Sequence, residues 1–252
     1  MFRVRRRDRE HDHQDELPEG WREVLAHTVE PWTAITEAER ARLESLAWHL
    51  ATTWRWEAAR GFEVTDEMVA TICGQAALMA AGLPDDVFRH VGSILVHPTT
   101  MVLHGEHSTV EGIVSDDATP IEGEAHWRGP VLLAWDAVLE DLDHPGDGRN
   151  VVHHELAHQI DMLDGTVDGT PPLGTRDELD RWVEVCTPVY EAVVVGEGGE
   201  VLDPYAGVNP GEFFAVATEA FFDVPVELRA EHPDLYEVLA GFYRQDPAHW
   251  YS

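Results

Sequence analysis

The segment from Val151 to Asp161 has the residue types and the spacing of a catalytic metal site. It places His154 and His158 four residues apart, with Glu155 directly after the first histidine. On a helix, residues four apart lie on one face, so both imidazoles can reach the same ion. Glu155 can then act as a general base on a water molecule beside the metal. Two imidazoles with an open coordination position suit zinc, so the segment predicts a hydrolytic zinc site.

A helix is the expected carrier of this motif. Residues 149–164 mix apolar and polar positions as half-buried helices do, and neither Pro nor Gly interrupts the run from Val151 to Asp164. Gly165 follows as a C-terminal stop. The chain contains 15 histidines, so a chance match to the motif has to be weighed. The helical context favours a metal site over chance.

A catalytic zinc site needs a third protein ligand, and the residues offer two sources for it. In an extended form of the motif, the glycine slot holds Asp161 and the last ligand slot holds Asp164. Asp161 is a poor substitute for a glycine that turns the chain back. The other source is the apolar segment 209–222, where Glu212 and Glu219 are seven residues apart and near one helix face. Buried carboxylates are costly unless paired or metal-bound, whereas solvated acids on an outer stripe are the ordinary alternative.

The remaining pattern predicts an α+β protein that is mostly helical, with a small sheet beside the motif helix. Apolar runs predict strands at 91–96 and 131–135. Residues 123–127 are either an edge strand that binds the peptide or a plain loop. Pro188 predicts a kink or break in its helix. Helical spacing, capping signals and stop signals mark residues 34–60, 65–81, 149–164, 178–193, 209–222 and 226–243, with a Gly/Pro/Thr loop at 165–175.

The composition limits the classes of partner. The chain has 48 acidic residues against 17 basic ones, all of the basic ones Arg, and a net charge of −31. Such a surface repels nucleic acid and anionic membranes, so we expect neither as a partner. A genome that encodes Arg rather than Lys would explain this balance, and so would adaptation to high salt. Cys73 and Cys186 are far apart in apolar surroundings and are expected to be free thiols.

The organisation predicted from the sequence is simple. Residues 1–18 carry mixed charge with no apolar stretch behind it, so we expect a disordered tail rather than a secretory signal. No run is long enough to cross a bilayer. No linker or internal repeat divides residues 19–252, which predicts one catalytic domain, with the cytoplasm as the default location.

Longer motifs occur in order along residues 20–250. They comprise residues 63–68, 123–125, 129–136, 143–150, 154–165, 203–216 and 242–247. In these segments the chain resembles the Mlc titration factor A family of zinc-dependent peptidases. Its metal-site motifs are also similar to those of the anthrax lethal factor peptidase domain. Several motifs in one order are more specific than the two-histidine motif alone. The resemblance implies a zincin-like fold of the gluzincin type.

The resemblance also implies a role for each site residue. His154, His158 and Glu212 would hold one zinc ion, and Glu155 would activate the water molecule. Tyr205, seven residues before Glu212, resembles the tyrosine that donates a hydrogen bond to the oxyanion of the tetrahedral intermediate. A phenol is a neutral donor at pH 7, which suits this role. Without the resemblance, Tyr205 would be interpreted as an ordinary loop tyrosine.

Other polar residues near the motif are candidates for orienting the imidazoles. Metal-binding histidines often donate their second N–H to a carboxylate. Asp161, Asp164 and Glu219 could each supply that carboxylate, and we expect one of them to do so. His153 falls on another helix face, so we expect it at the surface or behind the ligands rather than on the metal.

The function implied by the resemblance is hydrolysis of peptide bonds, with a modest aminopeptidase-like activity. In enteric relatives it also implies binding to the glucose repressor Mlc in the control of sugar uptake. A regulatory protein that keeps the zinc site and titrates a repressor is the main alternative, although Glu155 and Tyr205 favour the enzyme. A structural zinc domain would favour four ligands, often Cys, and neither Cys is near the motif. Two histidines and one carboxylate also suit non-haem iron.

Overall fold

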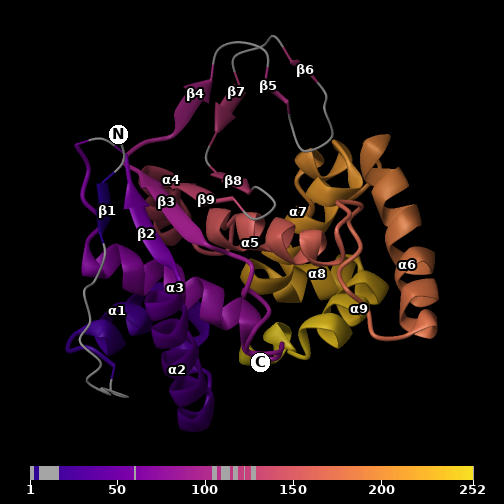
Figure 1. Cartoon of the computed structure of the whole chain (residues 1–252). Coiled ribbons are helices and arrows are strands. Elements are labelled where there is room, and N and C mark those ends of the chain that lie inside the picture. Colours follow the sequence, from indigo (N-terminus) through magenta and orange to yellow (C-terminus); the bar gives the residue numbers. More distant parts are fainter. Residues whose placement is uncertain are drawn as a thin grey trace.

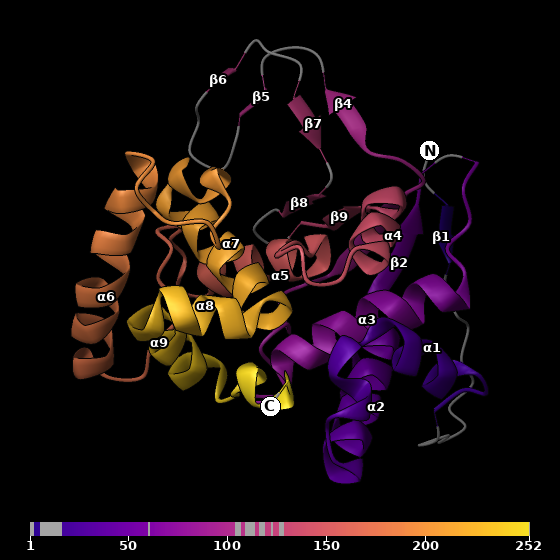
Figure 2. The ribbon, with the colours of Figure 1, turned by 180° about the vertical axis from the view of Figure 1, so that it is seen from behind.

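The structure is a computed structural model, and it describes residues 3–5, 17–59, 61–103, 107–108, 114–115, 119–121, 123–125 and 129–251. The described chain is mostly helical with a small main sheet, so the α+β prediction is confirmed (Figure 1). Helices α1–α3 gather on one side and α6–α9 on the other, with α5 between them (Figures 1 and 2). No helix in this part of the chain is both long and apolar enough to cross a membrane.

Five strands form the main sheet, in the order β1-β2-β3-β9-β8. The three central strands, β2 (Arg55–Ala58), β3 (Ser93–His97) and β9 (Val131–Ala134), run parallel to one another. The two edge strands, β1 (Arg3–Arg5) and β8 (Gly123–Ala125), pair antiparallel with their neighbours. Because α5 contacts both β8 and β9, this edge of the sheet supports the motif helix.

The apolar central strands form part of the core. Parallel strands covered on both faces are typically apolar along their whole length, and Ile94, Val96, Val131 and Leu133 are all buried. The strands predicted near 91–96 and 131–135 are confirmed with small shifts. Two further pairs of short strands lie outside the main sheet: β4 (Met101–Leu103) with β7 (Thr119–Ile121), and β5 (His107–Ser108) with β6 (Val114–Ser115).

The N-terminal helices follow the sequence signals closely. They are α1 (Trp21–Thr28), the 3-10 helix η1 (Glu30–Thr33), α2 (Glu37–Thr53) and α3 (Asp66–Ala80). Thr36 and Glu39 make the predicted capping box at the start of α2. The prediction that this helix reaches residue 60 is wrong, because Trp54 is extended and leads the chain into β2. Helix α3 is buried along almost its whole length and is therefore a core helix.

The predicted disordered tail (1–18) and the predicted edge strand or loop (123–127) lie only partly within the described residues. Residues 3–5 belong to the segment predicted to be a disordered tail, and they form β1 against β2. Residues 1–2 and 6–16 of that segment lie outside the described residues. Residues 123–125 form the edge strand β8, while 126–127 again lie outside the described residues.

The C-terminal half is helical. It contains α4 (Trp135–Asp143), α5 (Val151–Asp161), η2 (Met162–Asp164), α6 (Arg176–Val194), η3 (Pro204–Gly207), α7 (Pro210–Asp223), α8 (Pro225–Glu231), α9 (Pro233–Tyr243) and η4 (Pro247–Tyr251). Gly165, with a φ of 96°, ends the motif helix and its 3-10 extension as predicted. Pro188 lies inside α6 without ending it. Phe214 and Phe221 of α7 are fully buried, so α7 is the core helix of this half.

Candidate metal centre

Helix α5 is fixed at its N-terminal end by side chains from two other helices. Asp141 of α4 accepts the backbone N–H of Val151 at 2.7 Å. Glu219 of α7 accepts the backbone N–H of Asn150 at 2.8 Å, and Asn150 itself caps the helix. The first N–H groups of a helix have no partner within the helix, so these bonds satisfy them. The direction of α5 is thereby tied to both α4 and α7.

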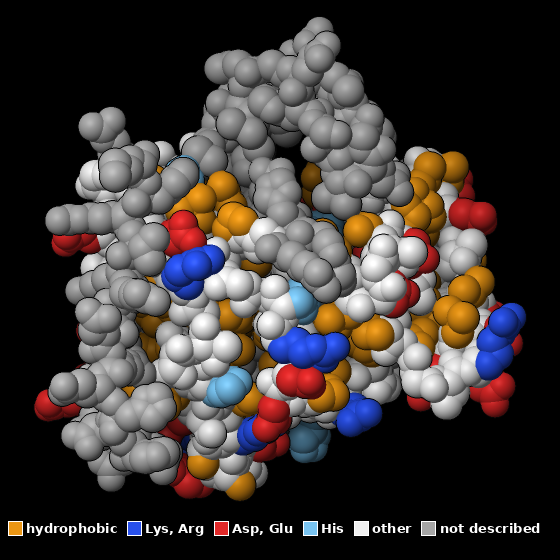
Figure 3. All heavy atoms as spheres, viewed as in Figure 1, with side chains coloured by type: hydrophobic (Ala, Val, Ile, Leu, Met, Phe, Trp, Pro, Cys, Tyr) orange, Lys and Arg blue, Asp and Glu red, His pale blue; other side chains and the backbone are white. Residues whose placement is uncertain are grey.

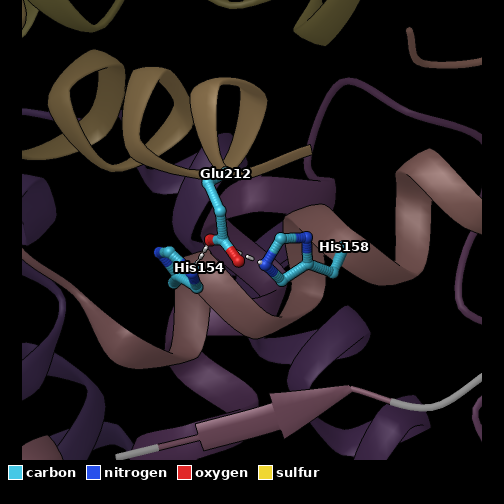
Figure 4. Close-up of side chains that lie close together, drawn as sticks. All are labelled: His154, His158 and Glu212. Atoms are coloured by element: carbon cyan, nitrogen blue, oxygen red, sulfur yellow. Dashed lines mark hydrogen bonds and ion pairs between the residues drawn. The ribbon is translucent and has the colours of Figure 1, made fainter. Parts of the chain in front are cut away.

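Helix α7 presents its first turn to α5. Pro210 opens α7, a position where proline costs no hydrogen bond. Asn209 caps the helix by accepting the backbone N–H of Glu212 at 2.9 Å. Glu212 therefore sits in the first turn, and its side chain points toward the motif helix (Figure 4).

The side chains of His154, His158 and Glu212 converge on one point (Figure 4). The Oε2 atom of Glu212 lies 3.0 Å from Nε2 of His154 and 3.3 Å from Nε2 of His158. One ligand atom from each residue lies within 4.8 Å of the others. Among the residues that the structure describes, this is the one group of three or more such side chains able to hold a metal ion.

The carboxylate of Glu212 and the imidazole of His154 stabilise each other's charged forms. Burial by itself lowers the pKa of His154, but the nearby carboxylates of Glu219 and Glu212 outweigh it and raise the pKa well above the usual value. Burial by itself raises the pKa of Glu212, but hydrogen bonds from His154 and His158 hold it far below the usual range. A divalent cation bound here would take the place of the proton on Nε2 of His154.

Glu219 supports His154 from the ring nitrogen opposite to Glu212. Its Oε2 lies 2.8 Å from Nδ1 of His154, while Glu212 lies against Nε2. Glu219 is only 8% exposed, and its other oxygen holds the start of α5. A carboxylate on the second nitrogen fixes the tautomer and the ring orientation of a metal-binding histidine. Of the three acids considered for this role, Glu219 makes such a contact.

Asp161 holds a loop in place instead. Its Oδ2 accepts the backbone N–H of Gly169 at 3.0 Å, and the whole residue is buried. The Gly169 carbonyl accepts a hydrogen bond from Trp182 Nε1 at 3.2 Å. Gly169 has a φ of 73°, and a Cβ there would collide with the Pro210 carbonyl, so only glycine fits. Asp161 and Gly169 thus join the loop after α5 to the first turn of α7, next to Glu212.

Asp164 and His153 lie away from the cluster. Asp164 is exposed and accepts the backbone N–H of Thr166 at 2.9 Å, a local turn contact. Of the two places expected for His153, the surface is excluded, because the residue is 2% exposed and α5 contacts both α3 and α7. Its Nε2–H donates to the Gln75 carbonyl of α3 at 3.2 Å, and its ring packs against Phe222 of α7 at 5.1 Å. Burial lowers the pKa of His153 to about 4.

Tyr205 and Glu155 lie beside the cluster. The ring of Tyr205 is 6.1 Å from the ring of His154, and Asp203 fixes its backbone by accepting its N–H at 2.8 Å. Partial burial and the carboxylates of Glu212 and Glu155 raise the pKa of Tyr205 well above the usual value, so the phenol stays protonated. Glu155 is 5% exposed. Its charge contributes to the raised pKa values of His154 and Tyr205.

Three supporting residues were not singled out from the sequence. Asp141 lies in α4, and no signal in the short run after Trp135 predicted that helix. Gln75 is a polar residue inside the apolar helix α3, which could have suggested a buried partner. Gly169 belongs to a glycine-rich loop, where nothing in the sequence marks a close approach to another backbone.

The donor set fits a divalent transition metal. Two imidazole nitrogens and one carboxylate oxygen are ligands that zinc accepts, and three protein ligands leave a position open. The same set also suits iron. Neither cysteine belongs to the cluster: Cys73 and Cys186 are both buried and free, and burial raises the pKa of Cys186 to about 12.

The whole chain is similar to known proteins. The model of the glucose-regulated metallo-peptidase M90 family matches residues 2–244. An uncharacterized protein of Synechocystis sp. is 33% identical, over 93% of this chain and 86% of the relative. The Mlc titration factor A of Yersinia enterocolitica is 31% identical, over 93% of this chain and 88% of the relative. That of Yersinia pestis is 30% identical, over 93% and 87%.

Proposed function

Because the chain belongs to the glucose-regulated metallo-peptidase M90 family, we propose that it is a zinc-dependent peptidase that hydrolyses peptide bonds. The observation that carries the proposal is the convergence of His154, His158 and Glu212 on one point, with Glu155 buried next to it. We assign these three residues as the zinc ligands and residues 19–252 as the catalytic domain, in a zincin-like fold of the gluzincin type.

The chain's own residues would divide the work of hydrolysis. When bound, zinc would polarise the scissile carbonyl and make a water molecule more acidic. Glu155 would take the proton from the attacking water and pass it to the leaving amine. The Tyr205 hydroxyl, kept protonated, would donate to the carbonyl oxygen as negative charge develops on it. Glu219 would hold the Nδ1 proton of His154 and keep Nε2 free for the metal.

The variant Glu155→Gln tests this proposal. Gln keeps the size of the side chain but cannot accept the proton, so we expect hydrolysis to fall by at least about 100-fold. Zinc content and thermal stability should remain as in the wild type, since Glu155 is not assigned as a ligand. The readout is turnover of quenched fluorescent peptides and of aminoacyl anilides, which also separates endo- from exopeptidase activity. Undiminished hydrolysis in this variant would contradict the proposed role of Glu155.

A second function is supported by the relatives named Mlc titration factor A. This chain would then bind a transcriptional repressor and retain the metal site for another purpose. Titration of the purified protein with an Mlc-type repressor, followed by calorimetry, tests this directly. Tight binding together with a wild-type protein that contains zinc but cleaves no peptide would favour the regulatory function over the peptidase.

A further inference from the structure

An exposed apolar strip begins beside the metal cluster. In a chain with 48 acidic residues, Tyr205 is 49% exposed, Val208 56%, Val194 53% and Val195 68%. These four residues are called the apolar strip below. Figure 3 shows hydrophobic side chains gathered over the upper end of α6, on the side of the molecule where α7 also lies. Single exposed apolar residues are ordinary, but a contiguous group next to a candidate active site marks a binding surface.

The fold places Val208 next to Tyr205. The two residues lie three apart across η3, and the backbone N–H of Val208 donates to the Tyr205 carbonyl at 3.0 Å. In a 3-10 helix, side chains three residues apart eclipse one another, so these two point in the same direction. The Tyr205 ring is 6.1 Å from the His154 ring, so Val208 is joined to the cluster through Tyr205.

The strip continues from η3 onto the end of α6. A Cβ built on Gly207 would lie 3.3 Å from Cα of Val194, so the two backbones touch. Val194 is the last residue of α6, and Val195 is its C-cap. Both valines are more than half exposed, as stated above. The apolar strip therefore extends from Tyr205 beside the cluster, along η3, to the end of α6, which contacts η3 at Gly207.

We propose that the apolar strip is a substrate subsite that receives an apolar side chain of the peptide next to the scissile bond. This inference rests on the proposed peptidase function and specifies its substrate class. A peptide whose carbonyl oxygen reaches the Tyr205 hydroxyl would place its neighbouring side chain beside Val208, because Val208 lies one 3-10 turn after Tyr205. An apolar side chain there is stabilised by the removal of its surface from water. An acidic side chain would instead meet the carboxylates of Glu212 and Glu155 and a chain of net charge −31.

A peptide series measures this preference. The probes are quenched fluorescent peptides of one length that carry Leu, Ser or Asp at either side of the cleaved bond. We expect the wild type to favour Leu over Ser by about tenfold in kcat/KM, with Asp the poorest, since small apolar contacts discriminate on this scale. Equal turnover of the Leu and Ser peptides overturns the inference. A wild type that cleaves none of the peptides overturns the proposed function as well, so the two failures are distinguishable.

Variants of Val208 locate the preference in the strip. Val208→Asp should lose about tenfold in kcat/KM for the Leu peptide, carried by KM, while Val208→Leu stays within about twofold of the wild type. Val183→Asp is the matched control, because Val183 is 50% exposed on α6 but outside the strip. Val208→Thr, nearly the same shape, serves if the Asp variant folds poorly. A Val208 variant that slows Leu and Ser peptides equally overturns the inference.

Discussion

The two sides of the candidate site are built in different ways. The inner wall consists of Asp141, Asn150, Asp161, Gly169 and Glu219. Its side chains hydrogen-bond to the backbone of neighbouring elements and so hold these elements in place. Asp161 is fully buried and Glu219 is 8% exposed. The outer wall consists of Tyr205 and Val208, which are 49% and 56% exposed. The inner wall is therefore expected to set metal affinity and stability, and the outer wall to set turnover and choice of substrate.

The largest effect should come from the outer wall. Tyr205→Phe removes the proposed donor to the carbonyl oxygen, and we expect kcat to fall by about 10²–10³-fold, or about 3–4 kcal/mol. Zinc content and the free energy of unfolding should not change, because the ring remains. Tyr251→Phe is the control, since Tyr251 is 43% exposed and bonds Glu30 instead. A loss of zinc in Tyr205→Phe would contradict the claim that the outer wall sets turnover while the inner wall sets metal affinity.

Gly169→Ala tests the inner wall. The added methyl group would collide with the Pro210 backbone and would force a left-handed residue, which together should cost about 3 kcal/mol of unfolding free energy. Gly165→Ala is a matched control, because Gly165 also has a positive φ, 96°, but no atom lies within 4 Å of its Cβ position. We expect about 1 kcal/mol for the control. Urea unfolding measures both, and equal losses would show that the contact with Pro210 is unimportant.

Glu219→Gln tests whether the inner wall sets the affinity for zinc. Glu219 accepts one hydrogen bond on each carboxylate oxygen, from the His154 ring and from the Asn150 backbone. An amide has a single oxygen and cannot accept both in this way, so the ring loses its orientation. We expect zinc affinity to fall by about 10–100-fold, measured by competition with a chromogenic chelator. Glu227→Gln, a change to an exposed acid on α8, should leave the affinity unchanged. Wild-type zinc affinity in Glu219→Gln would mean that the contact seen in the structure does not orient the ligand.

The smallest effect concerns Asp141 and pH. Burial raises the pKa of Asp141 to about 7, whereas an unfolded chain has a value of about 3.9. The folded protein then keeps a proton that the unfolded chain releases, so this stabilisation is present below about pH 4 and is lost as the pH rises to 7.

Asn at this position stays neutral and can still accept the Val151 N–H. Between pH 4.5 and 7.5 the wild type should therefore lose about 1–2 kcal/mol relative to Asp141→Asn. Asp143→Asn, a change to an exposed acid, is the control. Chemical unfolding at both pH values measures the difference, and a pH-independent gap between wild type and Asp141→Asn would refute the linkage.

Local signals in the sequence predicted the elements that carry the site. The Thr36–Glu39 capping box, the uninterrupted motif helix and the stop at Gly165 all depend on neighbours within a few residues, and all are present. Glu212 and Glu219 were both recognised in the sequence as unusual acids in an apolar helix. Their different places, one between two imidazoles and the other behind His154, depend on how α7 packs against α5, which periodicity does not encode.

The supporting contacts could not be predicted from the sequence, because they too depend on how distant elements pack against one another. Asp161 was one of the three acids considered for orienting an imidazole, since it follows His158 by three residues and lies on a similar helix face. In the structure it holds Gly169 instead, because the loop returns to meet the first turn of α7. Such a contact depends on the path of a loop in space. His153 likewise is buried because α3 covers a face of α5 that the local pattern alone leaves open.

Metal content is the most direct test of the central claim that Glu212 completes the metal centre. We expect about one zinc ion per chain in the wild type and a large loss in Glu212→Ala, with folding confirmed by circular dichroism. Glu227→Ala is the control and should keep its zinc. Stoichiometric zinc in Glu212→Ala, or a wild type that binds no zinc after exposure to a slight excess, would contradict the account.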